Sequence, residues 1–155
     1  MSDRSLHAAS ATARALRRLV PSEIGALGVD VVDIEDFTND LDADPSVFLA
    51  SVFLDSEVLE CDGQPDRLAT RFAAKEATLK ALGTGARGIG MTDVEVCTAP
   101  EGAPFVRLTP AAALVAERAG IRDLHVSVTR DAGLAIAVVV GTIDQLQHNH
   151  ERQGL

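Results

Sequence analysis

The hydrophobic and polar positions of this chain follow two periods, and the period of a helix is clearest between residues 65 and 83. Apolar side chains recur there at steps of four, seven and three residues, at Leu68, Phe72, Leu79 and Leu82. This spacing puts them on one face of a helix. Pro65 suits a first helical turn, and Gly83 suits the position just past a helix end. The pattern therefore predicts one long helix that Pro65 opens and Leu82 closes.

Strand-like patterns, rich in β-branched or alternating apolar residues, lie on both sides of this helix. They cover residues 24–34, 91–98, 104–109, 124–129 and 134–140. The last stretch is apolar throughout, so we expect it to be central or covered on both faces. Further helices are expected at 47–54, 56–61 and 111–119, the second of them capped by Asp55; the acidic residues between 33 and 45 predict a charged helix or loop. Strands separated by helices, with hairpins toward the C-terminal half, predict an α+β fold.

The chain of 155 residues predicts one domain at 23–143, flanked by an N-terminal extension at 1–22 and a polar tail at 144–155. The extension has a short apolar stripe beside several arginines, which is typical of an appended helix or a loose basic arm. A helix packed on the domain is the favoured interpretation, and contact with a membrane or a partner helix is the alternative. His148 and His150 in the tail could bind a metal ion, although a frayed terminus is favoured.

Composition narrows the possible partners. The net charge of −9 and the isoelectric point near 4.8 argue against a nucleic-acid or anionic-membrane partner, and the absence of Trp and Tyr argues against base stacking. Cys61 and Cys97 form neither a metal-binding spacing nor a disulfide framework, which favours a reducing cytoplasm. No stretch has the length of a membrane span or the pattern of a signal peptide. These features predict a cytoplasmic globular protein.

Three charged residues are candidates for chemistry. Asp30 interrupts the apolar run of the first strand, where a carboxylate is costly unless a metal ion or an arginine meets it. Glu76 and Lys80 lie one turn apart on the long helix and therefore point the same way. They could hold a metal ion and a phosphate, or they could form an ordinary helical ion pair. The residues alone leave both interpretations open.

A glycine-rich stretch follows the helix at residues 83–90. Glycines let backbone amides approach an anion closely, and Thr84 and Arg87 add donors. The stretch lacks the Gly-Lys-Ser/Thr ending of a Walker loop, and it follows a helix rather than the strand of a dinucleotide fingerprint. By itself it is typical of a flexible connection.

Three segments together resemble the holo-acyl-carrier-protein synthase family of 4′-phosphopantetheinyl transferases. They are GVDVVDI at 28–34, RFAAKEATLKALGTG at 71–85 and HVSVTR at 125–130. The resemblance extends in order from about residue 27 to 141, and its central motif is specific. It implies a small antiparallel sheet with a long helix, subunits that form a homotrimer, and a coenzyme A site at a subunit boundary.

The resemblance also implies an activity, the Mg²⁺-dependent transfer of 4′-phosphopantetheine from coenzyme A to a serine of an acyl carrier protein, as in fatty acid or polyketide biosynthesis. By position, Asp30 and Glu76 match the metal-binding carboxylates, and Lys80 matches the residue that meets the diphosphate. These three are the expected catalytic residues. The expected coenzyme A contacts are Arg71, Lys75, Lys80, Gly83, Thr84, Gly85, Ser127 and Arg130.

The chain departs from the family pattern on the helix face that grips the acidic carrier. Asp36, Val47 and Ser51 stand where the family has basic residues, so an acidic carrier should be repelled at long range. Arg130 replaces a histidine, and it can meet a phosphate but cannot titrate near neutral pH. The lost basic face favours one alternative, a non-catalytic coenzyme A-binding or assembly subunit of the same fold. Another alternative is an enzyme of this fold that uses coenzyme A with a different acceptor.

Overall fold

The computed structural model of the chain describes residues 24–83 and 88–143. The predictions for the extension at 1–22, for the tail at 144–155 and for Thr84 and Gly85 therefore lie outside the described residues. Within the described ranges, no helix combines the length and the apolar character needed to cross a membrane.

The described chain begins with a strand, continues through four helices and ends with strands around one more helix. The elements are β1 (Ile24–Asp33), α2 (Ile34–Ala43), α3 (Pro45–Val52), α4 (Asp55–Glu60), α5 (Pro65–Ala81), the 3₁₀ helix η1 (Met91–Asp93), β2 (Val94–Thr98), β3 (Pro104–Leu108), α6 (Pro110–Arg118), β4 (Ile121–Asp131) and β5 (Leu134–Ile143). The long helix α5 begins with proline at its first position, as predicted from the sequence.

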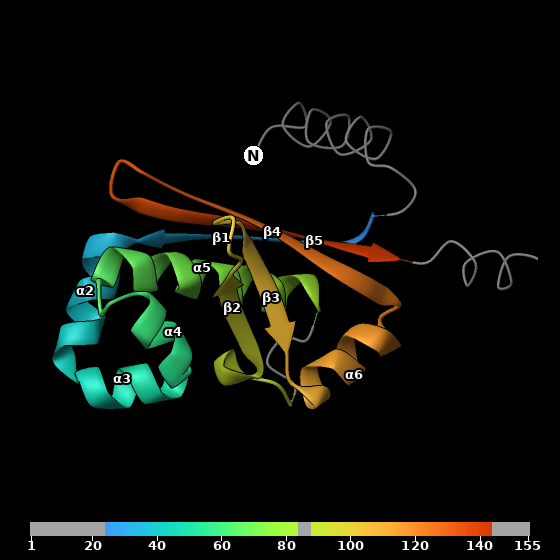
Figure 1. Ribbon diagram of the computed structural model, residues 1–155, viewed down its shortest axis with the longest axis horizontal. Coiled ribbons are helices and arrows are strands. Elements are labelled where there is room, and N and C mark those ends of the chain that lie inside the picture. The colour runs from blue at the N-terminus through green and yellow to red at the C-terminus, as the bar shows by residue number, and fades with distance from the viewer. Residues whose placement is uncertain (1–23, 84–87, 144–155) are drawn as a thin grey trace, which may run out of the picture.

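The strands form two separate antiparallel sheets. β1, β5 and β4 form a three-stranded sheet in the order β1-β5-β4, and β2 pairs with β3 in a separate hairpin. Figure 1 shows α5 lying along one face of the larger sheet, with α2–α4 gathered at one end of the molecule and α6 at the other. The prediction of an α+β fold with a central last strand is confirmed.

The core lies between α5 and the three-stranded sheet. α5 presents small residues to the sheet, and Ala73, Ala74 and Ala77 are fully buried. The strand β5 packs against the helix with Ala135, Ala137 and Val139, which are also fully buried. Small side chains on both elements let the helix and the sheet approach closely, because little volume separates the two backbones.

Two local predictions differ from the structure. Met91–Asp93 is a 3₁₀ turn and not the start of a strand, because Asp93 accepts a hydrogen bond from the amide of Gly90 and another from the Thr109 hydroxyl. The helix α4 has Leu54 rather than Asp55 at its N-cap, and the amide of Leu54 donates to the side chain of Glu57. Asp33 caps α2, as its position at the end of a strand indicates.

Candidate functional site

The approach of β1 to α5 depends on Gly28. A Cβ atom at this position would lie 1.8 Å from the carbonyl oxygen of Ala77 and 2.8 Å from the amide nitrogen of Ala81, so no other residue fits without moving the helix. Side chains alternate along a strand, and Asp30 therefore faces α5 from the same side of β1 as Gly28. The glycine two residues earlier thus fixes the carboxylate beside the C-terminal half of the helix.

Asp30 meets Lys80 at this contact. The Nζ atom of Lys80 lies 2.5 Å from Oδ1 of Asp30 and 3.3 Å from the carbonyl oxygen of Val29. The hydrogen bond to Asp30 raises the pKa of Lys80 above its ordinary value, and the negative charges of Asp30 and Glu76 act in the same direction. The structure thus brings Asp30 of β1 into contact with Lys80, and Glu76 lies one turn before Lys80 on α5.

The donors at this point suit a hard divalent cation that also binds substrate. The described residues contain no group of three or more His, Cys, Asp and Glu side chains that could enclose a metal ion by themselves. Mg²⁺ commonly takes only one or two carboxylates and completes its shell with water and substrate phosphates. Asp30 and Glu76 fit this partial set of ligands.

Arg71 is held in the interior by three side chains. Its Nε donates to Sγ of Cys61 at 3.1 Å, and its Nη2 donates to Oε2 of Glu60 at 2.6 Å and to Oγ1 of Thr98 at 3.0 Å. The residue is only 8% exposed, and its Nη1 is buried without a hydrogen-bond partner among the described residues. A buried guanidinium nitrogen is costly without an acceptor, so Nη1 is suited to bind an anion in this space.

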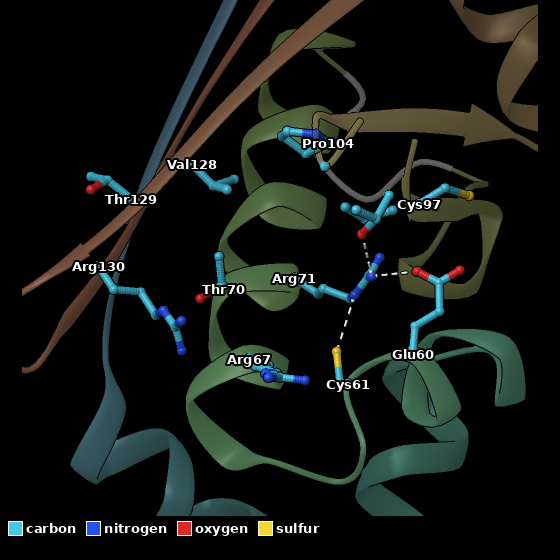
Figure 2. A pocket seen from close by; sticks show the side chains of 13 residues that line it. Glu60, Cys61, Arg67, Thr70, Arg71, Cys97, Pro104, Val128, Thr129 and Arg130 are labelled. Carbon is cyan, nitrogen blue, oxygen red and sulfur yellow. Dashed lines mark hydrogen bonds and ion pairs between the residues drawn. The ribbon is translucent and has the colours of Figure 1, made fainter. Parts of the chain in front are cut away.

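Arg71 borders a cleft of about 900 Å³ between the N-terminal half of α5, the β2–β3 hairpin and β4. Arg67 and Arg130 also line this cleft, and Figure 2 shows the two side chains on either side of Thr70. The Thr98 hydroxyl, which accepts a hydrogen bond from Nη2 of Arg71, also lies in the lining and has its own proton to donate. Three guanidinium groups and a hydroxyl around one space are suited to phosphate groups.

Lys75, expected among the coenzyme A contacts, lies in the core. Its ammonium group is 2.6 Å from Oε2 of Glu57 and donates to the carbonyl oxygens of Met91 and Val94. Both ionic side chains are 1% exposed or less. This geometry satisfies all three protons of the ammonium group inside the chain, so its direct role here is to join α5 to α4 and to the start of β2.

Two further expected contacts stand apart from the cleft. Ser127 is exposed on β4, opposite Val138 of β5. It therefore faces the side of the sheet away from α5, since the neighbouring Val128 lines the cleft. Gly83 is exposed directly after α5.

The expected site residues fall into two clusters within one chain. Arg71 and Arg130 line the cleft, whereas Asp30, Glu76 and Lys80 are not among its lining residues. Both clusters lie along α5, one at its N-terminal half and the other at its C-terminal half.

Sequence reasoning missed several residues of the cleft. Arg67 could have been found from its spacing, because it lies one turn before Arg71 and points the same way. Cys61 and Thr98 could not, because they meet Arg71 only through the packing of α4 and β2 against α5. Burial raises the pKa of the Cys61 thiol, so this sulfur stays protonated and neutral at neutral pH.

Comparison with known proteins places the matched region over the described fold. A sequence model of the 4′-phosphopantetheinyl transferase superfamily matches residues 26–139. The holo-[acyl-carrier-protein] synthase of Anaeromyxobacter sp. (strain K) is 42% identical over 120 residues, which cover 74% of this chain and 92% of that protein. The synthase of Streptomyces coelicolor is 42% identical over 117 residues, covering 74% of this chain and 94% of its own.

Solved structures agree with these sequence matches. The Helicobacter pylori holo-[acyl-carrier-protein] synthase in complex with coenzyme A is 31% identical, with a TM-score of 0.68 over 74% of this chain and 98% of that one. The acyl carrier protein synthase of Mycobacterium tuberculosis is 33% identical, with a TM-score of 0.61 over 78% and 99% of the two chains.

Proposed function

This chain belongs to the 4′-phosphopantetheinyl transferase superfamily, among the holo-[acyl-carrier-protein] synthases, and from this membership we propose that it transfers 4′-phosphopantetheine from coenzyme A to a serine of an acyl carrier protein. We place the reaction in the cytoplasm, since Cys61 and Cys97 are both free thiols.

The observation that carries this proposal is the contact of Asp30 with Lys80 beside Gly28, one helical turn from Glu76 on α5. In the transfer, the serine Oγ attacks the phosphorus that bears the pantetheine arm, and the bond from that phosphorus to the leaving 3′,5′-ADP breaks. Lys80 stabilises the charge that develops on the leaving phosphate, because its raised pKa keeps it protonated. The serine proton goes to Glu76 or to a water molecule beside it.

Asp30 and Glu76 would hold the Mg²⁺ ion that the family uses. Their two carboxylates provide a partial ligand set, which leaves room for diphosphate oxygens. When bound, Mg²⁺ supplies positive charge that neutralises the diphosphate. Lys80 now bonds Oδ1 of Asp30, and it would turn from this oxygen toward the diphosphate when both ligands are present.

The cleft beside Arg71 would hold phosphate groups of coenzyme A. Nη1 of Arg71, which lacks a partner among the described residues, supports this role, as do Arg67 and Arg130 in the lining. Lys75 would act indirectly, by fixing α5 through Glu57. We retain Gly83, Thr84, Gly85 and Ser127 as proposed coenzyme A contacts that a second subunit would bring to the ligand.

We propose that the active form is a homotrimer. Leu27, Val29 and Val31 expose 61%, 47% and 55% of their surface on the face of β1 turned away from α5. An apolar strand face of this kind is typical of an interface with another chain. The separation of the two residue clusters within one chain also favours a site completed at a subunit boundary.

We expect the preferred carrier protein to have a docking surface that is not strongly acidic. Residues 33–60 contain acidic residues and no lysine, arginine or histidine, and Asp36, Val47 and Ser51 are all exposed. A surface of this charge slows association with an acidic partner and favours a neutral or basic docking helix.

The test is incubation of the protein with Mg²⁺, coenzyme A and a panel of carrier proteins that span acidic to basic docking helices. Mass spectrometry should show the addition of one phosphopantetheine to at least one carrier, with the less acidic carriers modified faster. Binding of coenzyme A without modification of any carrier would instead favour an assembly subunit of the same fold. Transfer only to an acceptor that is not a carrier protein would favour an enzyme of this fold that uses coenzyme A with a different acceptor.

A further inference from the structure

The cleft holds two arginines in different ways, although both face the same space. Arg71 has Glu60, Cys61 and Thr98 around it, and its Nη1 has no hydrogen-bond partner in the part of the chain that the structure describes. Arg130 instead forms an ion pair with Asp66, through its Nη1 and the carboxylate Oδ2. The guanidinium group of Arg71 therefore has a nitrogen available for an anion, whereas that of Arg130 is already paired with the carboxylate of Asp66.

The exposures of the two pairs indicate which one can exchange. The side chain of Arg71 is 10% exposed, whereas Arg130 and Asp66 are 41% and 49% exposed. An ion pair so close to water is weak, because solvent screens it and both side chains lose freedom to form it. A phosphate dianion carries more charge than a carboxylate, so it can displace Asp66 from Arg130 at small cost.

Asp66 is not itself a lining residue, but its backbone position at the start of α5 holds it beside Arg130, which lines the cleft. It is the second residue of α5, directly after Pro65, and its carbonyl oxygen accepts a hydrogen bond from the Thr70 hydroxyl. A negative side chain in the first turn is also favoured by the helix dipole. The backbone of Asp66 therefore stays near Arg130, and its carboxylate can return to the guanidinium group when the cleft is empty.

We infer that Asp66 is an internal competitor for the phosphate, which occupies Arg130 in the empty cleft and weakens the binding of coenzyme A. The inference rests on the proposed function, because it takes the cleft to be a coenzyme A site. Arg71 provides the permanent part of the anion site, and Arg130 joins it only after exchanging its partner. Asp66 thereby sets the affinity of the site without touching the reacting atoms.

The test measures binding of 3′,5′-ADP, the nucleotide portion of coenzyme A, by calorimetry at low ionic strength. Asp66→Asn keeps the shape of the side chain and removes its charge, and it should bind the nucleotide about two- to fivefold more tightly than the parent protein. Asp42→Asn is the matched control, because it removes the same charge from an exposed position of α2 outside the cleft. This control should bind as the parent does.

A double-mutant cycle separates competition from a general change of charge or fold. In the Arg130→Ala background, Asp66→Asn should change the affinity by much less, since the guanidinium group that pairs with Asp66 is then absent. Thermal unfolding of every variant checks that each one is folded. If the single variant Asp66→Asn binds 3′,5′-ADP as tightly as the parent protein or more weakly, the inference is overturned. Asp66 would then have no effect on binding, or it would position Arg130 for the ligand.

The same titrations distinguish failure of this inference from failure of the proposed function. Arg71→Lys keeps the charge but removes the Nη1 donor, and it should bind 3′,5′-ADP more weakly than the parent protein. A parent protein that does not bind the nucleotide, or an Arg71→Lys variant that binds it unchanged, would overturn the cleft as a coenzyme A site and Asp66 as its competitor. Weakened Arg71→Lys with unchanged Asp66→Asn would overturn the role of Asp66 alone.

Discussion

Two lysines on α5, five residues apart, form ion pairs of nearly equal length in opposite surroundings. Nζ of Lys75 lies 2.6 Å from Glu57, and Nζ of Lys80 lies 2.5 Å from Asp30. The first side chain is fully buried, whereas the second is 51% exposed. Burial lowers the pKa of Lys75 against the opposing charge of Glu57, and the hydrogen bond to Asp30 raises the pKa of Lys80.

The difference shows that one helix carries a structural lysine on its buried face and a lysine available to a ligand on its exposed face. Lys75 has three acceptors inside the chain, so its ammonium group joins α5 to α4 and β2. Lys80 has a carboxylate and a weakly held carbonyl, and water reaches half of its side chain. Such a group can change partners when a ligand arrives, whereas a buried pair cannot.

The largest effect on stability is expected from Lys75→Met. It leaves the Glu57 carboxylate buried without its cation, so the free energy of unfolding should fall by about 3–5 kcal/mol. Urea denaturation of the parent protein and the variant measures the difference. Adding Glu57→Gln should restore part of the loss, because no uncompensated charge then remains. A single variant as stable as the parent would mean that the pair contributes nothing to the fold.

The next effect in size concerns the exposed cluster, through Glu76→Gln. This change keeps the shape and removes the charge, so the transfer rate should fall by about 10²–10³-fold while the free energy of unfolding stays within about 0.5 kcal/mol. Transfer is followed by mass spectrometry and stability by urea denaturation. Glu101→Gln, in the exposed turn before β3, is the matched control and should leave both quantities unchanged. Full activity in Glu76→Gln would refute its assignment as a metal ligand.

Lys80→Met should have a smaller effect on transfer than Glu76→Gln. The loss of one charged hydrogen bond to the leaving phosphate corresponds to about a ten- to hundredfold lower rate. Stability should change by less than about 1 kcal/mol, because the pair with Asp30 is exposed. The same two assays apply, and a large loss of stability would make Lys80 structural, as Lys75 is.

The contrast between the two lysines also marks what the sequence can predict. The order of strands and helices follows from periodicity, and the apolar run at 134–140 correctly indicated a central strand. The convergence of Asp30 and Lys80 followed only from family resemblance, since they are far apart in the chain. Lys75 is adjacent to Glu76 in the same motif, and motif matching alone gives it the same kind of role. Its burial depends on Glu57 and Val94, which come from distant elements, and no local pattern reveals that packing.

The finest test of the comparison uses the opposite directions in which the two pKa values move. The native pKa of Lys75 lies below 10.5, its ordinary value, so the unfolded chain binds more protons between those two pH values, and the contribution of Lys75 to stability should rise with pH there. The native pKa of Lys80 lies above 10.5, so the native state binds more protons, and its contribution is complete below pH 10.5 and is lost as the pH rises through the native pKa.

Urea denaturation from pH 7 to pH 11 of the parent protein, of Lys75→Met with Glu57→Gln, and of Lys80→Met gives both contributions as differences from the parent. Other titrating groups cancel in each difference, because all three proteins share them over this range. The difference for Lys75 should increase with pH, and that for Lys80 should stay level and then decrease by at most about 1 kcal/mol, since its pair is exposed. Two differences that change in the same direction would contradict the division of roles between the buried and the exposed pair.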